Sequence, residues 1–213
     1  VGAGLSVAGA TFQGILLNPL ADPYTLGISA GAALGASVAL VFDFSFLGVY
    51  SIPLCAFLGA ILTLLLVIAL ASSKTNSYAA FAVSSNNLIL AGVIVTAIFS
   101  AAISFVKYLA DEEVAVIIFW LMGSFASKGW PDVLLSLVIV STGTLLVFFF
   151  ASDLNIISLG DKTARSLGVD TDRVRIFLLI VASLMAAICV SISGIIGFVG
   201  LIIPHLVRFL FGP

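Results

Sequence analysis

The sequence predicts an all-α protein, a bundle of helices that crosses a lipid membrane. Hydrophobic residues make up 62% of its 213 residues and charged residues 8%, whereas a typical globular domain has about 45–50% apolar and about 25% charged residues. A soluble domain of this length has too much surface for its volume to hide so many apolar side chains. The few charges are also confined to short stretches, which separate long apolar segments. Both observations indicate a polytopic membrane protein.

Seven segments have the length and composition of membrane-spanning helices. A helix that crosses the bilayer needs about 20 mostly apolar residues. The predicted spans are 1–17, 27–42, 49–71, 87–106, 133–152, 174–192 and 195–211, with a short additional helix near 114–123. The chain begins and ends within apolar runs, so we interpret residues 1–213 as one transmembrane domain and as an internal part of a longer protein.

Small residues and prolines indicate how these spans begin and pack. Gly27, Gly31 and Gly35 recur every four residues and form one ridge of the second span, which favours close contact between helix backbones. Pro53 stands near the start of the third span, where a missing N–H is harmless. Pro204 lies inside the last run and is expected to kink or shorten that helix.

The basic residues predict the orientation of the bundle, because cytoplasmic loops of membrane proteins are enriched in Lys and Arg. If the loop around 72–86 is cytoplasmic, then the segments 18–26 and 153–173 and the end after 207 are cytoplasmic as well. That side holds Lys74, Lys162, Arg165, Arg173, Arg175 and Arg208. The opposite side holds Lys107 and Lys128. The first span therefore runs inward, and 107–132 is external.

Composition also argues against several classes of function. The net charge is −2, which gives no basic surface for nucleic acid. Cys55 and Cys189 lie in apolar runs, and His205 has no nearby Cys, Asp or Glu, so the spacing of a metal site is absent and no cofactor is expected in this chain. An intramembrane protease would need a nucleophile with its base or paired aspartates, and neither pattern occurs. We do not expect an enzyme.

The sequence predicts no ionisable residue inside the bilayer, which bears on how a transporter would be driven. Proton-coupled carriers place titratable groups inside the bilayer because these groups carry the coupling. Their absence here suggests that energy enters from outside the membrane. A sodium site built from hydroxyls and carbonyls stays open as an alternative, so an ion-coupled secondary carrier or channel is the rival function. A membrane scaffold without transport activity is a third.

The polar segment between Asp153 and Asp172 is too polar to cross the membrane and too patterned for a slack linker. We expect a short helix there, capped by Ser158 or Asp161 and ended by Gly168. Ala164 and Leu167 would then share one face. This helix packs on its own bundle in one interpretation and docks into a groove of a soluble partner in the other.

A polar stripe runs along the span 87–106. Gly92, Thr96, Ser100 and Ser104 are spaced by four and lie on one helix face. Their hydroxyls bond a neighbouring turn or helix in one interpretation and line a wet route in the other. The polar patch Ser84, Ser85, Asn86 and Asn87 precedes this span at its cytoplasmic end, where a constriction could close without a bulky charge.

Several motifs resemble one family of membrane proteins over essentially the whole chain. They are GATFQG at 9–14, NPLADP at 18–23, LGISAGA at 26–32, LAGV at 90–93, FWLMGS at 119–124, LGDKTARSLG at 159–168 and GFVGLIIPH at 197–205. Their order and spacing are similar to those of the FecCD-type, BtuC-like permeases. These are the membrane subunits of ABC importers for iron–siderophores, haem, vitamin B12 and related metal chelates.

The resemblance implies a fold, partners and site residues. Such permeases have about ten spans and work as dimers, bound to two ATPase subunits and an extracytoplasmic binding protein in the prokaryotic cytoplasmic membrane. This chain would hold the second to eighth spans and lack the first and the last two. The family's cytoplasmic gate falls on Ser84–Asn87, and its pathway helix carries Thr96, Ser100 and Ser104. The family's ATPase-coupling helix falls on Leu159, Asp161, Ala164, Arg165, Leu167 and Gly168.

The resemblance is specific for the family and weak for the cargo. An iron–siderophore is the first expectation, while haem, cobalamin and molybdate stay open. The partners implied are ATP-binding subunits, a binding protein, a second permease subunit as homodimer or heterodimer, and membrane lipid.

Overall fold

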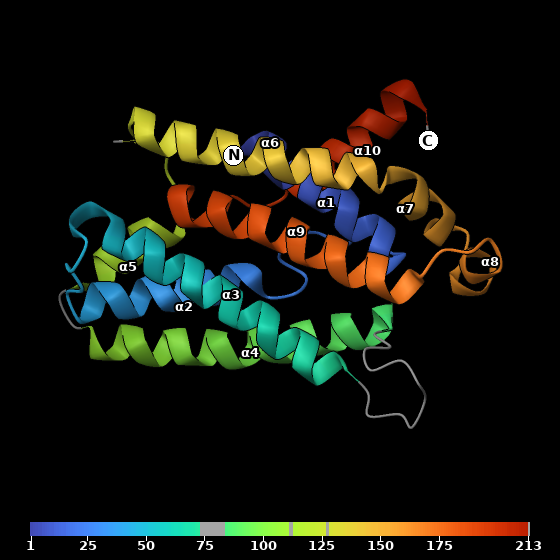
Figure 1. The fold of residues 1–213 in the computed structure, drawn as a ribbon. Coiled ribbons are helices and arrows are strands. Elements are labelled where there is room, and N and C mark those ends of the chain that lie inside the picture. The colour runs from blue at the N-terminus through green and yellow to red at the C-terminus, as the bar shows by residue number, and fades with distance from the viewer. Residues whose placement is uncertain (73–83, 111–112, 127, 213) are drawn as a thin grey trace.

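The computed structural model describes residues 1–72, 84–110, 113–126 and 128–212, and within these ranges every regular element is a helix (Figure 1). The predicted all-α fold is therefore confirmed. In chain order the helices are α1 (Gly2–Leu16), α2 (Ile28–Val41), the short 3₁₀ helix η1 (Gly48–Tyr50), α3 (Ser51–Ala71), α4 (Ser85–Leu109), α5 (Val114–Leu121), α6 (Trp130–Phe149), α7 (Ala151–Ser158), α8 (Asp161–Ser166), α9 (Thr171–Ser193) and α10 (Val199–Phe211).

A helix lies at each of the seven predicted spans, but not every one of these helices is long enough to cross a membrane. Four stretches are long and apolar enough to cross a membrane, namely Gly48–Ala71, α4, α6 and α9. The helices α2 and α10 are apolar but shorter, with 14 and 13 residues. A helix of 14 residues is only about 21 Å long. Neither α2 nor α10 therefore crosses a bilayer by itself.

The reason for the short α2 is that the chain turns back into the bundle after α1, as Figure 1 shows. Pro23 lies against Gly200, whose backbone also meets Gly9 and the Leu5 carbonyl about halfway along α1. The prediction that 18–26 is simply a cytoplasmic loop is therefore wrong. Irregular backbone at this depth is tolerated only where protein buries it, and both Ala21 and Leu26 are fully buried.

Polar side chains of this returning segment satisfy its own backbone. One carboxylate oxygen of Asp22 accepts hydrogen bonds from the backbone N–H groups of Tyr24 and Thr25 and from the Thr25 hydroxyl, at 2.9–3.0 Å. The Tyr24 hydroxyl donates to the Ile196 carbonyl at 2.6 Å. This last bond joins the segment before α2 to the segment before α10, so two interrupted spans meet inside the bundle.

The glycine ridge of α2 packs against α3, as the spacing predicts. A methyl group added to Gly31 would collide with the Thr63 hydroxyl and the Gly59 carbonyl, and one added to Gly35 would collide with the Cys55 carbonyl. Gly59 in turn faces the Gly31 carbonyl. The two helix backbones therefore touch, and this contact depends on the missing side chains.

Helix α9 forms the centre of the bundle, because most of its residues are buried. Figure 1 shows it running between α6 on one side and α2 and α3 on the other. Its first turn lies at the same end of the molecule as the end of α1, the start of α4 and the short helix α8. This end carries the predicted functional residues.

Candidate functional site

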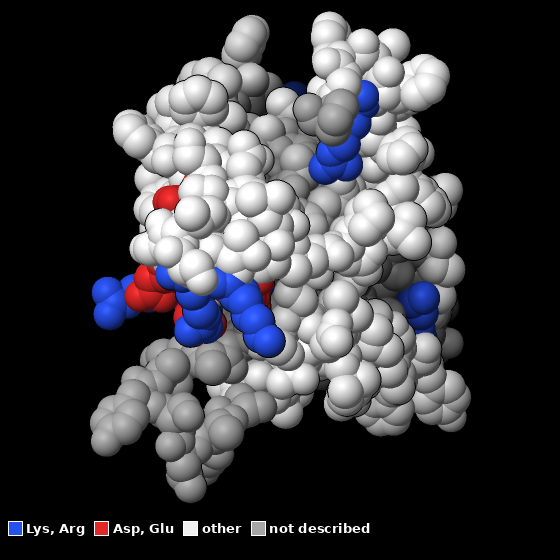
Figure 2. Space-filling model, turned by 90° about the vertical axis from the view of Figure 1, so that its right-hand side faces the viewer, with Lys and Arg blue, Asp and Glu red and all other residues white. Residues whose placement is uncertain are grey.

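Charged side chains gather at the end of the molecule that carries α8 (Figure 2). Lys162, Arg165, Arg173 and Arg175 belong to α8 and the start of α9. Lys107 lies in the last turn of α4, at the opposite end of that helix from the Ser84–Asn87 patch. This distribution agrees with the predicted orientation. Lys74, which the orientation argument also used, lies outside the described residues.

Two helices, not one, occupy the first part of the polar segment between Asp153 and Asp172, since α7 extends into it and α8 lies within it. Helix α7 continues closely from α6, and α8 follows after Leu159 and Gly160. The predicted side-chain cap is wrong, because the N-cap of α8 is Gly160 and the Ser158 hydroxyl donates to the Asn155 carbonyl instead. Gly160 takes a φ of 105°, a conformation that a side chain would oppose.

The predicted end of α8 at Gly168 is confirmed. Gly168 has a φ of 87°, and its N–H donates to the Arg165 carbonyl while the Val169 N–H donates to the Ala164 carbonyl. This pair of bonds is a Schellman motif, which requires a left-handed residue at the position of Gly168. A Cβ added to Gly168 would meet nothing within 4 Å, so backbone conformation alone selects glycine.

A buried arginine fastens α8 to the bundle. The side chain of Arg175 is 2% exposed, and its guanidinium donates to both carboxylate oxygens of Asp161, at 2.7 and 3.4 Å. Two parallel bonds between these planar groups give strength and a fixed orientation. A second ion pair, Arg165 with Asp172 at 2.7 Å, joins α8 to the first turn of α9 near its surface. Helix α8 is therefore held at two points.

The same guanidinium also reaches the end of α1. Its Nε donates to the Ile15 carbonyl at 3.1 Å. Helix α1 ends in a Schellman motif that satisfies the carbonyls of Gln13 and Gly14, which leaves Ile15 among the last carbonyls without an intrahelical partner. A cation at the C-terminal end of a helix also favours the helix dipole. Sequence reasoning used Arg175 only as one charge in a count and missed this role.

The predicted coupling residues divide into an inward and an outward group. Ala164 is fully buried, whereas Leu159 and Leu167 are 66% and 61% exposed. The expectation that Ala164 and Leu167 share a face is therefore wrong, because Leu167 follows the last turn and points outward. What we call the outer surface of α8 consists of Lys162 in the helix and of Leu159 and Leu167, which flank it. Asp161, Ala164 and Arg165 attach the helix to the bundle.

The predicted gate residues begin helix α4. The Ser84 hydroxyl accepts a hydrogen bond from the Asn87 N–H at 3.2 Å and caps the helix. The Ser85 hydroxyl donates to the Ile15 carbonyl at 3.1 Å. Asn86 is exposed, and Asn87 is half-buried. The four residues therefore differ in their contacts and in their exposure. Their role as a gate stays a prediction.

The polar stripe of α4 changes its surroundings along the helix. A methyl group added to Gly27 would lie 2.7 Å from the Thr96 hydroxyl, so Thr96 faces the segment that leads into α2. Ser100 and Ser104 are exposed, and the Ser104 hydroxyl donates to the Ser100 carbonyl at 3.0 Å. The stripe therefore combines helix packing at Thr96 with a surface that a pathway can use at the two serines.

Ionisable groups do lie inside the described bundle, although the sequence predicted none within the membrane. Arg175 is buried, and Asp22 is half-buried in the returning segment. Both are held by the local contacts given above. Among the described residues no group of three His, Cys, Asp or Glu side chains could hold a metal ion, and His205 is exposed.

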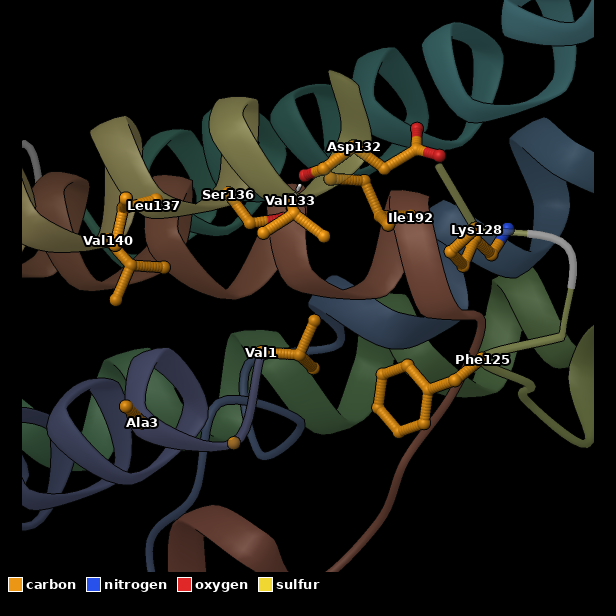
Figure 3. A pocket seen from close by; sticks show the side chains of 11 residues that line it. Val1, Ala3, Phe125, Lys128, Asp132, Val133, Ser136, Leu137, Val140 and Ile192 are labelled. Atoms are coloured by element: carbon orange, nitrogen blue, oxygen red, sulfur yellow. Dashed lines mark hydrogen bonds between the residues drawn. The ribbon is translucent and has the colours of Figure 1, made fainter. Parts of the chain in front are cut away.

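A cavity of about 370 Å³ opens at the opposite end, between the first residues of α1, the start of α6 and Ile192 of α9 (Figure 3). Its lining is mainly apolar, with Lys128, Asp132 and Ser136 as polar members. The lining contains none of the predicted gate, pathway or coupling residues. Asp132 accepts a hydrogen bond from the Gly129 N–H at 2.9 Å and serves as a helix cap.

Comparison with known proteins identifies the family. The model of the FecCD transport family matches residues 1–213. The chain is 40% identical to the ABC transporter permease YvrB of Bacillus subtilis, 39% identical to the molybdate import permease MolB of Haemophilus influenzae and 38% identical to the cobalamin import permease BtuC of Halobacterium salinarum. Each match covers 100% of this chain, and 59%, 61% and 56% of the respective relatives.

A solved structure, an inward-facing metal-chelate type ABC transporter, matches with a TM-score of 0.87 and 36% identity over 100% of this chain and 65% of its own. The helical bundle is thus that of an ABC transporter permease, an integral membrane protein. The chain belongs to the FecCD transport family. It spans a little under two thirds of the length of these relatives.

Proposed function

We propose that this chain is part of a permease subunit that imports a metal chelate or a related metal compound across a prokaryotic cytoplasmic membrane. A separate ATPase that docks on α8 drives the import. The observation that carries the proposal is the way α8 is built. Its outer surface presents Leu159, Lys162 and Leu167 to solvent, while Asp161 is clamped to the buried Arg175. Exposed leucines offer a partner an apolar surface to bind. Because the helix is rigidly attached, a movement of that partner is transmitted to the bundle.

The names of the relatives support the proposed class of cargo. Their names specify cobalamin, molybdate, hemin and iron(III) dicitrate for four related permeases. An iron–siderophore remains the first candidate for this chain. The route would run along the exposed serines of α4 beside a second permease subunit, and the Ser84–Asn87 patch would close it on the inside. An extracytoplasmic binding protein would deliver the cargo at the other end.

The described residues support an external motor over ion coupling. Asp22 and Arg175, the buried or half-buried ionisable groups discussed above, are both engaged in contacts that hold backbone or helix ends in place. A group that carries protons must change partners during the cycle. A weakly binding, hydroxyl-lined route leaves the switching free energy to the ATPase, since a ligand shifts an equilibrium only by its differential affinity for the two states.

Reconstitution of the full-length permease in proteoliposomes tests this function. Uptake of an iron–siderophore, haem, cobalamin or molybdate is expected only with the ATPase subunits and ATP present together. A proton or sodium gradient alone should give no uptake. Accumulation of a cargo driven by an ion gradient without the ATPase would contradict the proposal and favour the secondary carrier. Absence of transport under every condition, with the complex assembled, would favour a scaffold.

The outer surface of α8 is expected to be needed for coupling. Leu167→Asp places a charge on an exposed apolar side chain that has no part in the ion pairs of α8. We expect uptake to fall at least about tenfold, because desolvating an unpaired carboxylate in an interface costs more than about 1.4 kcal/mol. Membrane insertion and thermal stability should stay unchanged.

Asn155→Asp is the matched control, since it adds the same charge to an exposed position of α7. Equal uptake by both variants would argue against α8 as the docking site. Arg165→Glu is the less informative variant, because Arg165 already pairs with Asp172 within the chain.

A further inference from the structure

We infer that the Ile15 carbonyl, at the end of α1, is a shared joint that couples α8 to the first turn of α4, and that Arg175 is the positioning residue that builds this joint. The inference rests on the proposed function for its meaning, because it names the route by which motion of α8 reaches the start of α4. Its structural content stands on three side chains and one carbonyl from four different helices.

The joint is a continuous set of hydrogen bonds. Asp161 of α8 binds the guanidinium of Arg175 at 2.7 Å, and Arg175 Nε donates to the Ile15 carbonyl at 3.1 Å. The Ser85 hydroxyl of α4 donates to the same carbonyl oxygen at 3.1 Å. A carbonyl oxygen has two lone pairs and can accept both bonds at once. One atom at the end of α1, the Ile15 carbonyl oxygen, therefore binds α4 directly through Ser85 and α8 indirectly through Arg175.

The geometry makes this joint stiffer than an ordinary surface contact. Arg175 is 2% exposed, so water does not compete readily for its N–H groups. The planar guanidinium uses separate donors for Asp161 and Ile15, which fixes the angle between these two partners. The Ile15 carbonyl cannot turn independently, because the Schellman motif at Gln13 and Gly14 locks the backbone next to it.

The joint also explains why Ser85 differs from its neighbour. Ser84 caps α4 from within the same helix, whereas Ser85 bonds 70 residues away in sequence, to α1. Loss of Ser84 should loosen the first turn of α4 locally. Loss of Ser85 should remove the hydrogen bond that joins this turn to the Ile15 carbonyl, and with it the hydrogen-bonded route to Arg175 and α8. The two adjacent serines therefore form a matched pair for an experiment.

Hydrogen exchange of the full-length permease in lipid nanodiscs tests the joint without any need for transport. The readout is the exchange rate of the first-turn amides of α4, including Leu88. Asp161→Asn removes the charge that holds the guanidinium of Arg175. It is expected to raise this rate about fivefold, the change that corresponds to one hydrogen bond of about 1 kcal/mol. In a Ser85→Ala background the same substitution should change the rate less than about twofold, as for unlinked sites.

Ser84→Ala is the control. It should raise the exchange of α4 by itself but preserve the fivefold response to Asp161→Asn. The inference is wrong if Asp161→Asn leaves the exchange of α4 unchanged, or if its effect persists undiminished when Ser85 is replaced. Neither result depends on an ATPase or a cargo, so failure of the joint and failure of the proposed import function are told apart.

Discussion

Gly31→Leu is expected to push α2 away from α3 and to lower the free energy of unfolding of the permease by up to about 3 kcal/mol. The first atom of any side chain at this position meets the Thr63 hydroxyl and the backbone carbonyl of Gly59. A hydroxyl can rotate away, but a helix backbone cannot move without separating the two helices. Overpacking in a core costs about 1–3 kcal/mol and occasionally more, and a leucine against backbone belongs at the upper end. Thermal unfolding of the purified, detergent-solubilised full-length permease measures the effect.

Gly197→Leu is the control for this substitution. Gly197 is exposed, and a Cβ added to it would meet nothing within 4 Å. Its replacement should leave the unfolding temperature nearly unchanged. Gly31→Ala should give an intermediate loss, because its single methyl group already makes the backbone contact. If Gly31→Leu were as stable as Gly197→Leu, the close approach of α2 and α3 would be wrong.

The helical fold was predictable because it depends on composition and on the position of charges. Apolar runs such as 49–71 and 174–192 closely match α3 and α9. The glycine ridge also predicted a close contact correctly, since spacing by four places Gly31 and Gly35 on one face whatever the partner is. Gly168 ended α8 as expected, because a left-handed residue is a local requirement of the backbone.

The interrupted spans were not predictable from hydropathy, because a hydropathy window does not distinguish a helix from a buried turn. The signals were present in the sequence, however. Asn18, Pro19, Asp22 and Pro23 are turn-forming residues, and they stand between two apolar runs. Their usual turn geometry would have indicated that the chain turns sharply between the first span and the span 27–42, which α2 nearly matches in length. The start of α10 at Val199 rather than 195 has the same origin in the irregular segment before it.

The candidate site was predictable in its location and not in its contacts. Motifs placed α8 and the start of α4 at one end of the bundle, and the structure agrees. Which residues of α8 face inward depends on a partner 14 residues further along the chain, since Asp161 pairs with Arg175. Charge counting treats Arg173 and Arg175 alike, although one is exposed and the other is buried. Only the packing of α9 against α1 and α8 determines that Arg175 is buried while Arg173 is exposed.

Arg175→Met is expected to lower the free energy of unfolding by about 2 kcal/mol, the value typical of hydrogen bonds to a charged group in a buried setting. Methionine keeps much of the apolar stem of the arginine but donates nothing, so Asp161 and the Ile15 carbonyl each lose a partner. The loss is limited because Asp161 is 45% exposed and gains water. The Ile15 carbonyl also keeps its bond from Ser85.

Arg173→Met is the matched comparison, two residues away on the same helix. Its ion pair with Asp170 at 2.9 Å joins side chains that are 87% and 54% exposed, and pairs of this kind contribute about 0–1 kcal/mol. Chemical or thermal unfolding of both variants in the same detergent gives the difference directly. Equal stability of the two variants would mean that the buried contacts of Arg175 contribute no more than an exposed ion pair does. Helix α8 would then be held to the bundle by Ala164 and its other apolar contacts instead.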